Sequence, residues 1–240
     1  MVKNGNKYLL VITGPTGIGK TELAIRLNKK LNTSIISADS RQIYKEMQIG
    51  TAKPTIEVIF ENKIKVVNHI SIKENYSAGQ FELEATEQIC KDHNSNNFSI
   101  LCGGTGLYIK AVEEGLDQFP DIPKSILDEL ELELRTSGLH NLQNELSISD
   151  PITFAKMDVN NSRRVLRALS VIRTSGQTFS SFLDKPKPVR AFKIIRIILD
   201  MPREMLYEKI NARVDKMIVN GFFRNTQFCS NIIHSNAFKT

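Results

Sequence analysis

The chain has 240 residues, of which 41% are hydrophobic and 24% charged, an ordinary balance for a globular protein with a sizeable core. Its three cysteines are scattered and form no CxxC pair or Cys/His cluster, which argues against a disulfide framework or a structural zinc site. No apolar run approaches the roughly 18 residues of a membrane span, and the apolar start is too short for a signal peptide. We therefore expect a cytoplasmic protein that does not bind membranes.

The formal net charge of +6 is unevenly distributed along the chain. Residues 113–150 contain ten acidic and two basic residues, whereas residues 151–220 contain fourteen basic and six acidic residues. A basic block next to an acidic one is typical of a surface that meets a polyanion. A solvated helical surface with chance clustering is the alternative, and charge alone does not separate the two.

The first half of the chain alternates between predicted strands and helices. Short apolar runs predict the strands, helical spacing predicts the helix that follows the first one, and Ser77 with Gln80 has the form of a capping box. The predicted strands are Lys7–Thr13, Ser34–Ser37, Lys65–Ile70 and Phe98–Cys102, and the predicted helices are Thr21–Leu31 and Ser77–Lys91. Gly103 and Gly104 end the last strand. This order, with the glycine-rich segment GPTGIGKT at 14–21 between the first strand and the first helix, predicts an α/β fold, a P-loop NTPase-like parallel sheet flanked by helices.

The pattern changes after Gly115. Pro120 and Pro123 mark one break, and the KPKP segment at 185–188 marks another. Between the breaks lie predicted helices at 124–136, 151–157 and 162–174, and after them a strand at 191–199 and a helix at 203–220. The predicted domains are the first part of the P-loop core at 1–118, an all-helical insertion at 119–190, the continued core at 191–220, and an atypical tail at 221–240.

A glycine-rich segment between the first strand and the first helix fits the pattern G-x-x-x-x-G-K-[ST]. Its residues are Gly14, Pro15, Thr16, Gly17, Ile18, Gly19, Lys20 and Thr21. The glycines let main-chain amides turn toward phosphate oxygens, and the helix start and the Lys20 ammonium add positive charge. The Thr21 hydroxyl is suited to Mg²⁺. The alternative is a turn that merely links strand and helix, but the motif and its context both favour phosphate binding.

Asp39 follows the second predicted strand, at the sheet edge where ligands of open parallel sheets bind. Its carboxylate could ligate Mg²⁺, act as a general base, or cap the following segment. The helical insertion could be the lid of a small-molecule kinase or a nucleic-acid clamp. These residues alone leave both readings open.

Five blocks of sequence resemble the tRNA dimethylallyltransferases, also called tRNA isopentenyltransferases. They are GPTGIGKT with SADSRQIYKEMQIGTAKP (37–54), VNHISIKENYSAGQF (67–81), LCGGTGLYIKAVEEGL (101–116), NSRRVLRALSVIRTSGQ (161–177) and REMLYEKINARVDKM (203–217). The resemblance covers roughly residues 7–220. It implies transfer of a dimethylallyl group from dimethylallyl diphosphate to N6 of the adenosine 3′-adjacent to the anticodon, with the base flipped out of its stack.

The same resemblance implies a role for each site residue. Asp39 would accept the N6 proton, and Thr21 with Mg²⁺, Lys20 and the loop amides would stabilise the departing diphosphate. Arg213 would face the same phosphates, and Thr105 would touch the substrate nucleotide. Further contacts to tRNA would come from Asp39, Ser40, Arg41, Gln42, Arg163, Arg164 and Arg167. We expect a monomer.

Several of these assignments have plainer alternatives. Arg213 could be a solvated helix residue, and Arg163, Arg164 and Arg167 could form an exposed ion-pairing face. We expect His69 to be structural. The family's R-x-x-G-Y-[RK] segment is not found, and the residues after Gly221 resemble nothing in the family, so we expect a frameshift or premature end in the coding sequence.

Three other functions are compatible with parts of the sequence. A P-loop small-molecule kinase would share the fold, and a truncated, inactive tRNA-binding protein would keep the basic helix. A prenyltransferase acting on free adenine nucleotides is disfavoured, because such an acceptor needs no basic arm.

Overall fold

The computed structural model describes residues 6–183 and 186–230, which divide into two compact units. The first contains residues 6–115 and 188–230 of this range, and the second contains residues 116–187. Gly115 and Pro188 delimit the first unit and lie against one another, since a Cβ built on Gly115 would be 2.8 Å from Pro188 Cδ. The chain therefore leaves the first unit and returns to it at almost the same point.

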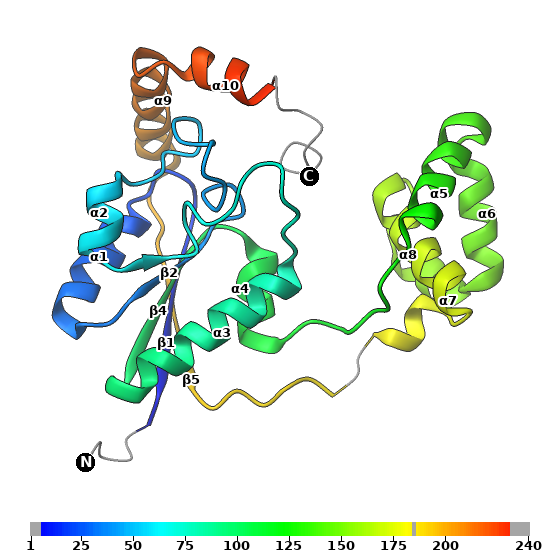
Figure 1. Cartoon of the computed structure of the whole chain (residues 1–240), viewed down its shortest axis with the longest axis horizontal. Helices are drawn as coiled ribbons and strands as arrows, with labels where there is room; N and C mark the ends of the chain where they lie inside the picture. Colours follow the sequence, from blue (N-terminus) through cyan, green and yellow to red (C-terminus); the bar gives the residue numbers. More distant parts are fainter. Residues whose placement is uncertain (1–5, 184–185, 231–240) are drawn as a thin grey trace. The chain divides into compact units, whose positions relative to one another are not determined.

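The first unit is built on a five-stranded parallel sheet with the order β3-β2-β4-β1-β5 (Figure 1). Its strands are β1 (Tyr8–Thr13), β2 (Ile35–Ala38), β3 (Ile64–Lys65), β4 (Phe98–Gly103) and β5 (Lys193–Ile198). Its helices are α1 (Lys20–Leu31), α2 (Ile56–Glu61), α3 (Ala78–Ser95), α4 (Gly106–Glu114), α9 (Arg203–Val219) and α10 (Phe222–Ser230). The predicted parallel α/β sheet is confirmed.

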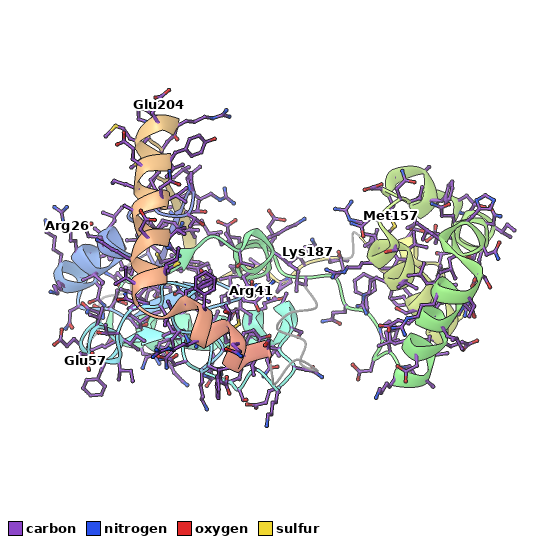
Figure 2. All side chains as sticks on the ribbon, turned by 90° about the horizontal axis from the view of Figure 1, so that it is seen from above. Arg26, Arg41, Glu57, Met157, Lys187 and Glu204 are labelled. Atoms are coloured by element: carbon purple, nitrogen blue, oxygen red, sulfur yellow. The ribbon has the colours of Figure 1, made fainter. Side chains whose placement is uncertain are left out.

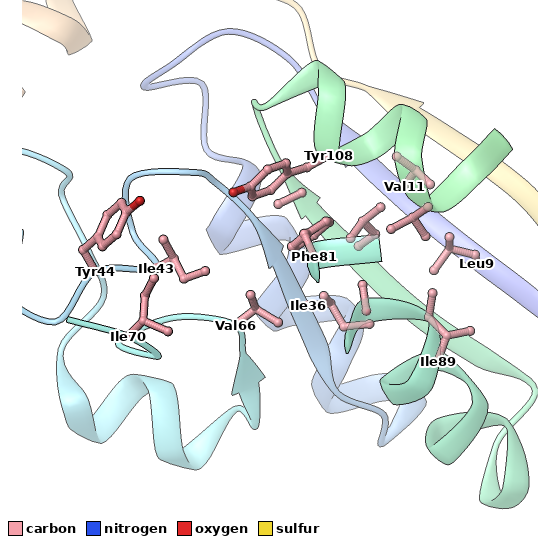
Figure 3. Packing of buried hydrophobic residues seen from close by; sticks show 14 of the residues in the cluster. Leu9, Val11, Ile36, Ile43, Tyr44, Val66, Ile70, Phe81, Ile89 and Tyr108 are labelled. Atoms are coloured by element: carbon pink, nitrogen blue, oxygen red, sulfur yellow. The ribbon is translucent and has the colours of Figure 1, made fainter. Parts of the chain in front are cut away.

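Alternating side chains of the strands pack against helices on both faces of the sheet. Leu9 and Val11 of β1 belong to the cluster that contains Phe81 of α3 and Tyr108 of α4, and Figure 3 shows this packing. Their neighbours Leu10 and Ile12 belong to the opposite cluster, with Ala24 of α1 and partly buried side chains of α2. The two-residue period of a strand thus builds two cores, and the parallel pairing places the carboxyl ends of all five strands at one edge of the sheet.

The predicted third strand is wrong in extent, because β3 has two residues instead of six. Val66 and Asn68 take positive φ values of 58° and 52°, which turns the chain out of the sheet. Ile70 then forms an isolated parallel bridge with Tyr44. A positive φ is unusual for a β-branched residue such as valine, and the apolar KVVNHI run gave no sign of it.

Four α-helices of the described residues were not predicted, namely α2, α4, α6 and α10. The helix α2 is capped by Thr55, whose hydroxyl accepts a hydrogen bond from Val58 N. The helix α4 follows directly on the glycines that end β4, and α6 is separated from α5 by Gly138 alone. The predicted capping box of α3 forms by half: Ser77 Oγ accepts from Gln80 N at 3.1 Å, but the Gln80 side chain donates to Glu84.

The second unit is entirely helical within the described residues. It contains α5 (Lys124–Ser137), α6 (Leu139–Ser149), α7 (Pro151–Lys156), α8 (Ser162–Ser175) and the 3-10 helix η1 (Phe179–Phe182). Its core is a separate cluster with Leu130, Leu142, Leu146 and Leu169 at its centre. No helix among the described residues is long and apolar enough to span a bilayer.

Ion pairs join the acidic and basic blocks of the sequence within the second unit. The guanidinium of Arg173 on α8 donates two hydrogen bonds to Glu133 at 2.8 Å each and two to Glu145 at 2.9 and 2.6 Å. These bonds raise the pKa of Arg173 and lower that of Glu133. Part of the charge asymmetry is therefore structural and is not available to a polyanion.

Candidate active site

The glycine-rich loop between β1 and α1 has the backbone conformation that a phosphate cradle requires. Gly14, Gly17 and Gly19 have φ values of 143°, 84° and 104°, which glycine adopts without strain. A Cβ on Gly14 would lie 2.5 Å from the carbonyl oxygen of Leu199, so this position also has no room for a side chain. The N-cap of α1 is Gly19, with no side-chain cap, which leaves the first amides of the helix for an anion.

Two cations face the same space from opposite ends of the sequence. The Lys20 ammonium donates to the carbonyl oxygens of Gly14 and Pro15 at 2.8 Å each, so it lies across the loop. Burial lowers the pKa of Lys20, and Arg213 lowers it further, whereas Cys102 and Asp39 act in the opposite direction. Neither Lys20 nor Arg213 has an ion-pair partner among the described residues. The pair is suited to an anion carrying more than one charge.

Asp39 lies one residue beyond β2, at the carboxyl edge of the sheet. Its Oδ1 accepts hydrogen bonds from the main-chain amides of Arg41 and Gln42 at 2.9 and 3.3 Å. Asp39 therefore caps a turn, and the helix N-cap considered from the sequence does not form, because no helix follows directly in the described chain. These bonds fix the direction of the carboxyl group, which a general base also requires.

The ends of β2 and β4 are joined next to Asp39. The Thr105 amide donates to Ala38 O at 3.0 Å, and the Thr105 hydroxyl accepts from Ser40 N at 3.0 Å. A Cβ built on Gly103 would lie 2.1 Å from Ala38 O, so the close approach of the strands depends on this glycine. Gly103 thus ends β4 and also allows β2 and β4 to approach closely next to Asp39.

A cavity of about 300 Å³ brings most of the predicted core-unit residues together. The predicted residues that line it are Thr16, Gly17, Gly19, Lys20, Thr21, Asp39, Gln42 and Arg213. Ile18 instead packs into the interior, with 7% of its surface exposed. A second cavity of about 430 Å³ shares Thr16, Asp39 and Arg213 with the first.

The helix α10 contributes to the lining of the second cavity, as does Arg41, which is labelled in Figure 2. Its cavity-lining residues are Phe222, Asn225, Thr226 and Cys229. Asn225 Nδ2 donates to Glu46 O at 3.0 Å, and the Cys229 side chain is buried in the main core. The segment expected to be an atypical tail is therefore part of the core unit as far as residue 230.

Sequence reasoning missed several residues that line or support these cavities. Cys102 lines the first cavity, and burial raises the pKa of its thiol to about 12, so it is no nucleophile. The carbonyl of Thr51 accepts from Gln42 Nε2 at 3.1 Å and from Arg213 at 3.4 Å. The GTAKP segment at 50–54 indicates a loop, because it is bounded by a glycine and a proline, but nothing in it indicates this contact.

The three predicted tRNA-contacting arginines of the second unit lie near the N-terminal end of α8. Arg163, Arg164 and Arg167 are all exposed. None of them has an ion-pair partner in the described part of the chain, although Arg167 stacks over the Phe119 ring at 5.1 Å. The alternative of an ion-pairing face is therefore not what the structure shows. His69, in contrast, contacts Glu84 at 3.0 Å, as expected for a structural histidine.

Comparisons with known proteins agree in naming one family. The profile of the IPP transferase family matches residues 42–239, which corrects the expectation that the segment after Gly221 resembles nothing in the family. The tRNA dimethylallyltransferase of Christiangramia forsetii is 44% identical over 92% of this chain and 74% of the relative. That of Cytophaga hutchinsonii is 42% identical over 98% of this chain and 77% of the relative.

Solved structures give the same result. The full-length tRNA isopentenylpyrophosphate transferase of Bacillus halodurans has a TM-score of 0.64 and 32% identity, covering 98% of this chain and 74% of its own. A eukaryotic dimethylallyltransferase described as acting on tRNA has a TM-score of 0.78 and 27% identity, covering 95% of this chain and 57% of its own. The fold, the phosphate loop and these matches together show that the chain belongs to the IPP transferase family, the tRNA dimethylallyltransferases.

Proposed function

We propose that the chain transfers a dimethylallyl group from dimethylallyl diphosphate to the exocyclic N6 of the adenosine 3′-adjacent to the anticodon of tRNA. One observation carries the proposal: the phosphate loop, Asp39 and Arg213 line the same cavity. An anionic leaving group and a carboxylate base thus share one space. The names of the curated relatives agree with this reaction.

The reaction forms a bond between N6 and the allylic carbon and breaks the bond between that carbon and the diphosphate oxygen. The electron pair of the broken bond leaves with the diphosphate, and the N6 proton passes to the Asp39 carboxylate. The phosphate loop, Lys20 and Arg213 line the cavity in which the leaving group would lie, and such preorganised charge is commonly the largest contribution to catalysis.

Mg²⁺ fits the donors that the site offers. The described residues contain no cluster of three or more His, Cys, Asp or Glu that could hold a metal by themselves. Mg²⁺ needs no such cluster, because it commonly keeps several waters and binds through one or two protein oxygens and the substrate phosphates. The Thr21 hydroxyl, which lines the cavity, would be its protein ligand. When bound, the ion would neutralise charge on the diphosphate.

The acceptor would be held partly by the second unit. Arg163, Arg164 and Arg167 present three positive charges without carboxylate partners among the described residues. Phosphate contacts of this kind supply affinity without reading sequence. Ser40, Arg41, Gln42 and Thr105 would approach the flipped nucleotide near Asp39, where hydrogen bonds already join Ser40 to Thr105.

The test is incubation of the full chain with isotopically labelled dimethylallyl diphosphate, Mg²⁺ and unmodified tRNA. Label should appear in tRNA and not in AMP offered as the acceptor. Calorimetry with inorganic pyrophosphate should give binding that Lys20→Met weakens. Pyrophosphate binding without label in tRNA would reduce the protein to a binding protein, and label transferred equally to AMP would overturn the choice of acceptor.

A further inference from the structure

We propose that Lys53 is a positioning residue, which holds the segment carrying Asp39 and Gln42 in register with Arg213. The proposal rests on the proposed function, since it concerns the alignment of the same base and the same leaving group. Lys53 lines a third cavity, next to the first one, and the proposed reaction does not use it. Its hydrogen bonds hold two loop segments next to the site.

The Lys53 ammonium joins two segments that come from different parts of the sheet edge. Its Nζ donates to the main-chain carbonyl of Tyr44 and, at 2.6 Å, to Oδ1 of Asn68. Tyr44 lies in the segment that begins at Asp39, whereas Asn68 lies in the segment that leaves β3. A charge-assisted bond to each of them ties these segments at one point.

The segments that Lys53 ties lie outside the regular sheet. Asn68 N donates to Gln42 O at 3.1 Å and His69 N to Ile43 O at 2.7 Å, which is a short ladder without a strand on either side. Val66 and Asn68 have positive φ values, a conformation that costs free energy for residues other than glycine. Contacts from outside must hold this arrangement, and Lys53 provides two of them.

The residues just before Lys53 reach the leaving-group side of the site. Thr51 O accepts from Gln42 Nε2 and from Arg213, and Ala52 between Thr51 and Lys53 also has a positive φ, of 47°. Residues 51–53 therefore contact the segment that begins at Asp39 at both of their ends, and they contact Arg213 at one end. A shift of Lys53 would move the segment that begins at Asp39 relative to Arg213.

The titration of Lys53 gives the proposal a distinctive readout. Burial lowers its pKa to about 8, against the opposing effect of Glu46, Cys229 and Asp39. The other charged groups on the same cavity, from α2 and α9, are Glu57, Lys209, Arg213 and Lys216. As pH rises through about 8, the ammonium becomes a neutral amine and its two bonds weaken. Transfer should therefore fall on the alkaline side.

The test compares Lys53→Met and Lys53→Arg with Lys65→Met, which removes an exposed lysine of β3. Amide hydrogen exchange at residues 42–47 and 66–70 should rise about tenfold or more in Lys53→Met, the effect of about 1.4 kcal/mol of lost local stability. Transfer should fall by about 10- to 100-fold, the scale of a misaligned reacting group, while pyrophosphate binding changes little. Lys65→Met should match the wild type in all three measurements.

The pH profile separates positioning from general loss of structure. The transfer rate of the wild type should fall above about pH 8, and the pH profile of Lys53→Met should lack this alkaline limb. Lys53→Arg keeps its charge and should recover part of the transfer, with the limb moved to higher pH. Unchanged exchange and an unchanged pH profile in Lys53→Met would overturn the proposal. If the wild type itself transfers nothing, the proposed function fails, and the exchange measurement still decides whether Lys53 holds the segment.

Discussion

Replacing Gly103 with alanine should damage both stability and transfer, for a reason visible at one atom pair. The new Cβ would lie 2.1 Å from Ala38 O, with Ala38 C at 2.4 Å. Both neighbours are backbone atoms of a paired strand, at the register Ala38↔Gly103, so neither can rotate away. Ordinary contact begins at 3.4 Å, so the strands β2 and β4 must separate at their carboxyl ends by more than 1 Å.

The size of the effect follows from this displacement. Overpacking of a well-packed core typically costs about 1–3 kcal/mol, and we expect about 2 kcal/mol here. For a unit of this size that corresponds to a fall in melting temperature of about 4–8 °C. Asp39 follows Ala38 directly, so a shift of about 1 Å should also lower transfer by about 10²-fold.

Gly106→Ala is the matched control, because a Cβ at Gly106 meets nothing within 4 Å and Gly106 is the first residue of α4. Chemical denaturation followed by circular dichroism, together with labelled transfer to tRNA, would compare the two variants. Gly106→Ala should equal the wild type in both assays. If Gly103→Ala is as stable and as active as Gly106→Ala, the close approach of β2 and β4 does not hold the site.

Three further predictions test other parts of the structure. Asp39→Asn should keep pyrophosphate affinity in calorimetry but lower transfer by about 10²-fold or more, the scale of a lost general base; unchanged turnover would refute the role. Asp150, which is buried, accepts from Thr153 N at 3.0 Å and Ser180 N at 2.7 Å; burial raises its pKa, but these and further hydrogen bonds lower it overall. The Asp150 carboxylate should therefore stabilise the second unit at pH values above the ordinary aspartate pKa of about 4. This stabilisation should disappear as pH falls through the lower pKa of the folded state. The Asp150→Asn variant should lose about 1–3 kcal/mol of unfolding free energy at neutral pH, and an acid-unfolding curve equal to that of the wild type would contradict this. Replacing Arg163, Arg164 and Arg167 together with glutamine should weaken tRNA binding. The slope of log affinity against log salt concentration, measured by filter binding, should fall by an amount that corresponds to the loss of up to about three phosphate contacts. An unchanged slope would show that α8 does not contact tRNA.

Local chemistry made the phosphate loop and the sheet predictable. The glycines and Lys20 have a fixed spacing, and the conformation of the loop depends on residues within it, so the sequence pattern is sufficient. The same holds for β1, β4 and β5, whose apolar runs pair in register along the centre and edge of the sheet. Helix α9 was predicted with similar success, because its pattern is local too.

The missed features depend on contacts between distant residues. The early end of β3 follows from positive φ values at Val66 and Asn68, and the bond from Lys53 to Asn68 supports them across 15 residues. The contact between Gly103 and Ala38 likewise exists only once β2 and β4 are paired. The shared cavity of Asp39 and Arg213 spans most of the chain, and the sequence suggested it by family resemblance and not by spacing.

The contact between Gly115 and Pro188 has a consequence for how such a protein can change over time. Because the helical unit enters and leaves the core at neighbouring points, its length and content impose little strain on the sheet, and closing a longer loop costs only slowly increasing entropy. Insertions, losses or exchanges of helices there would leave the leaving-group chemistry intact. If the helical unit holds tRNA as proposed, the affinity for tRNA can therefore evolve separately from the ability to move an allyl group.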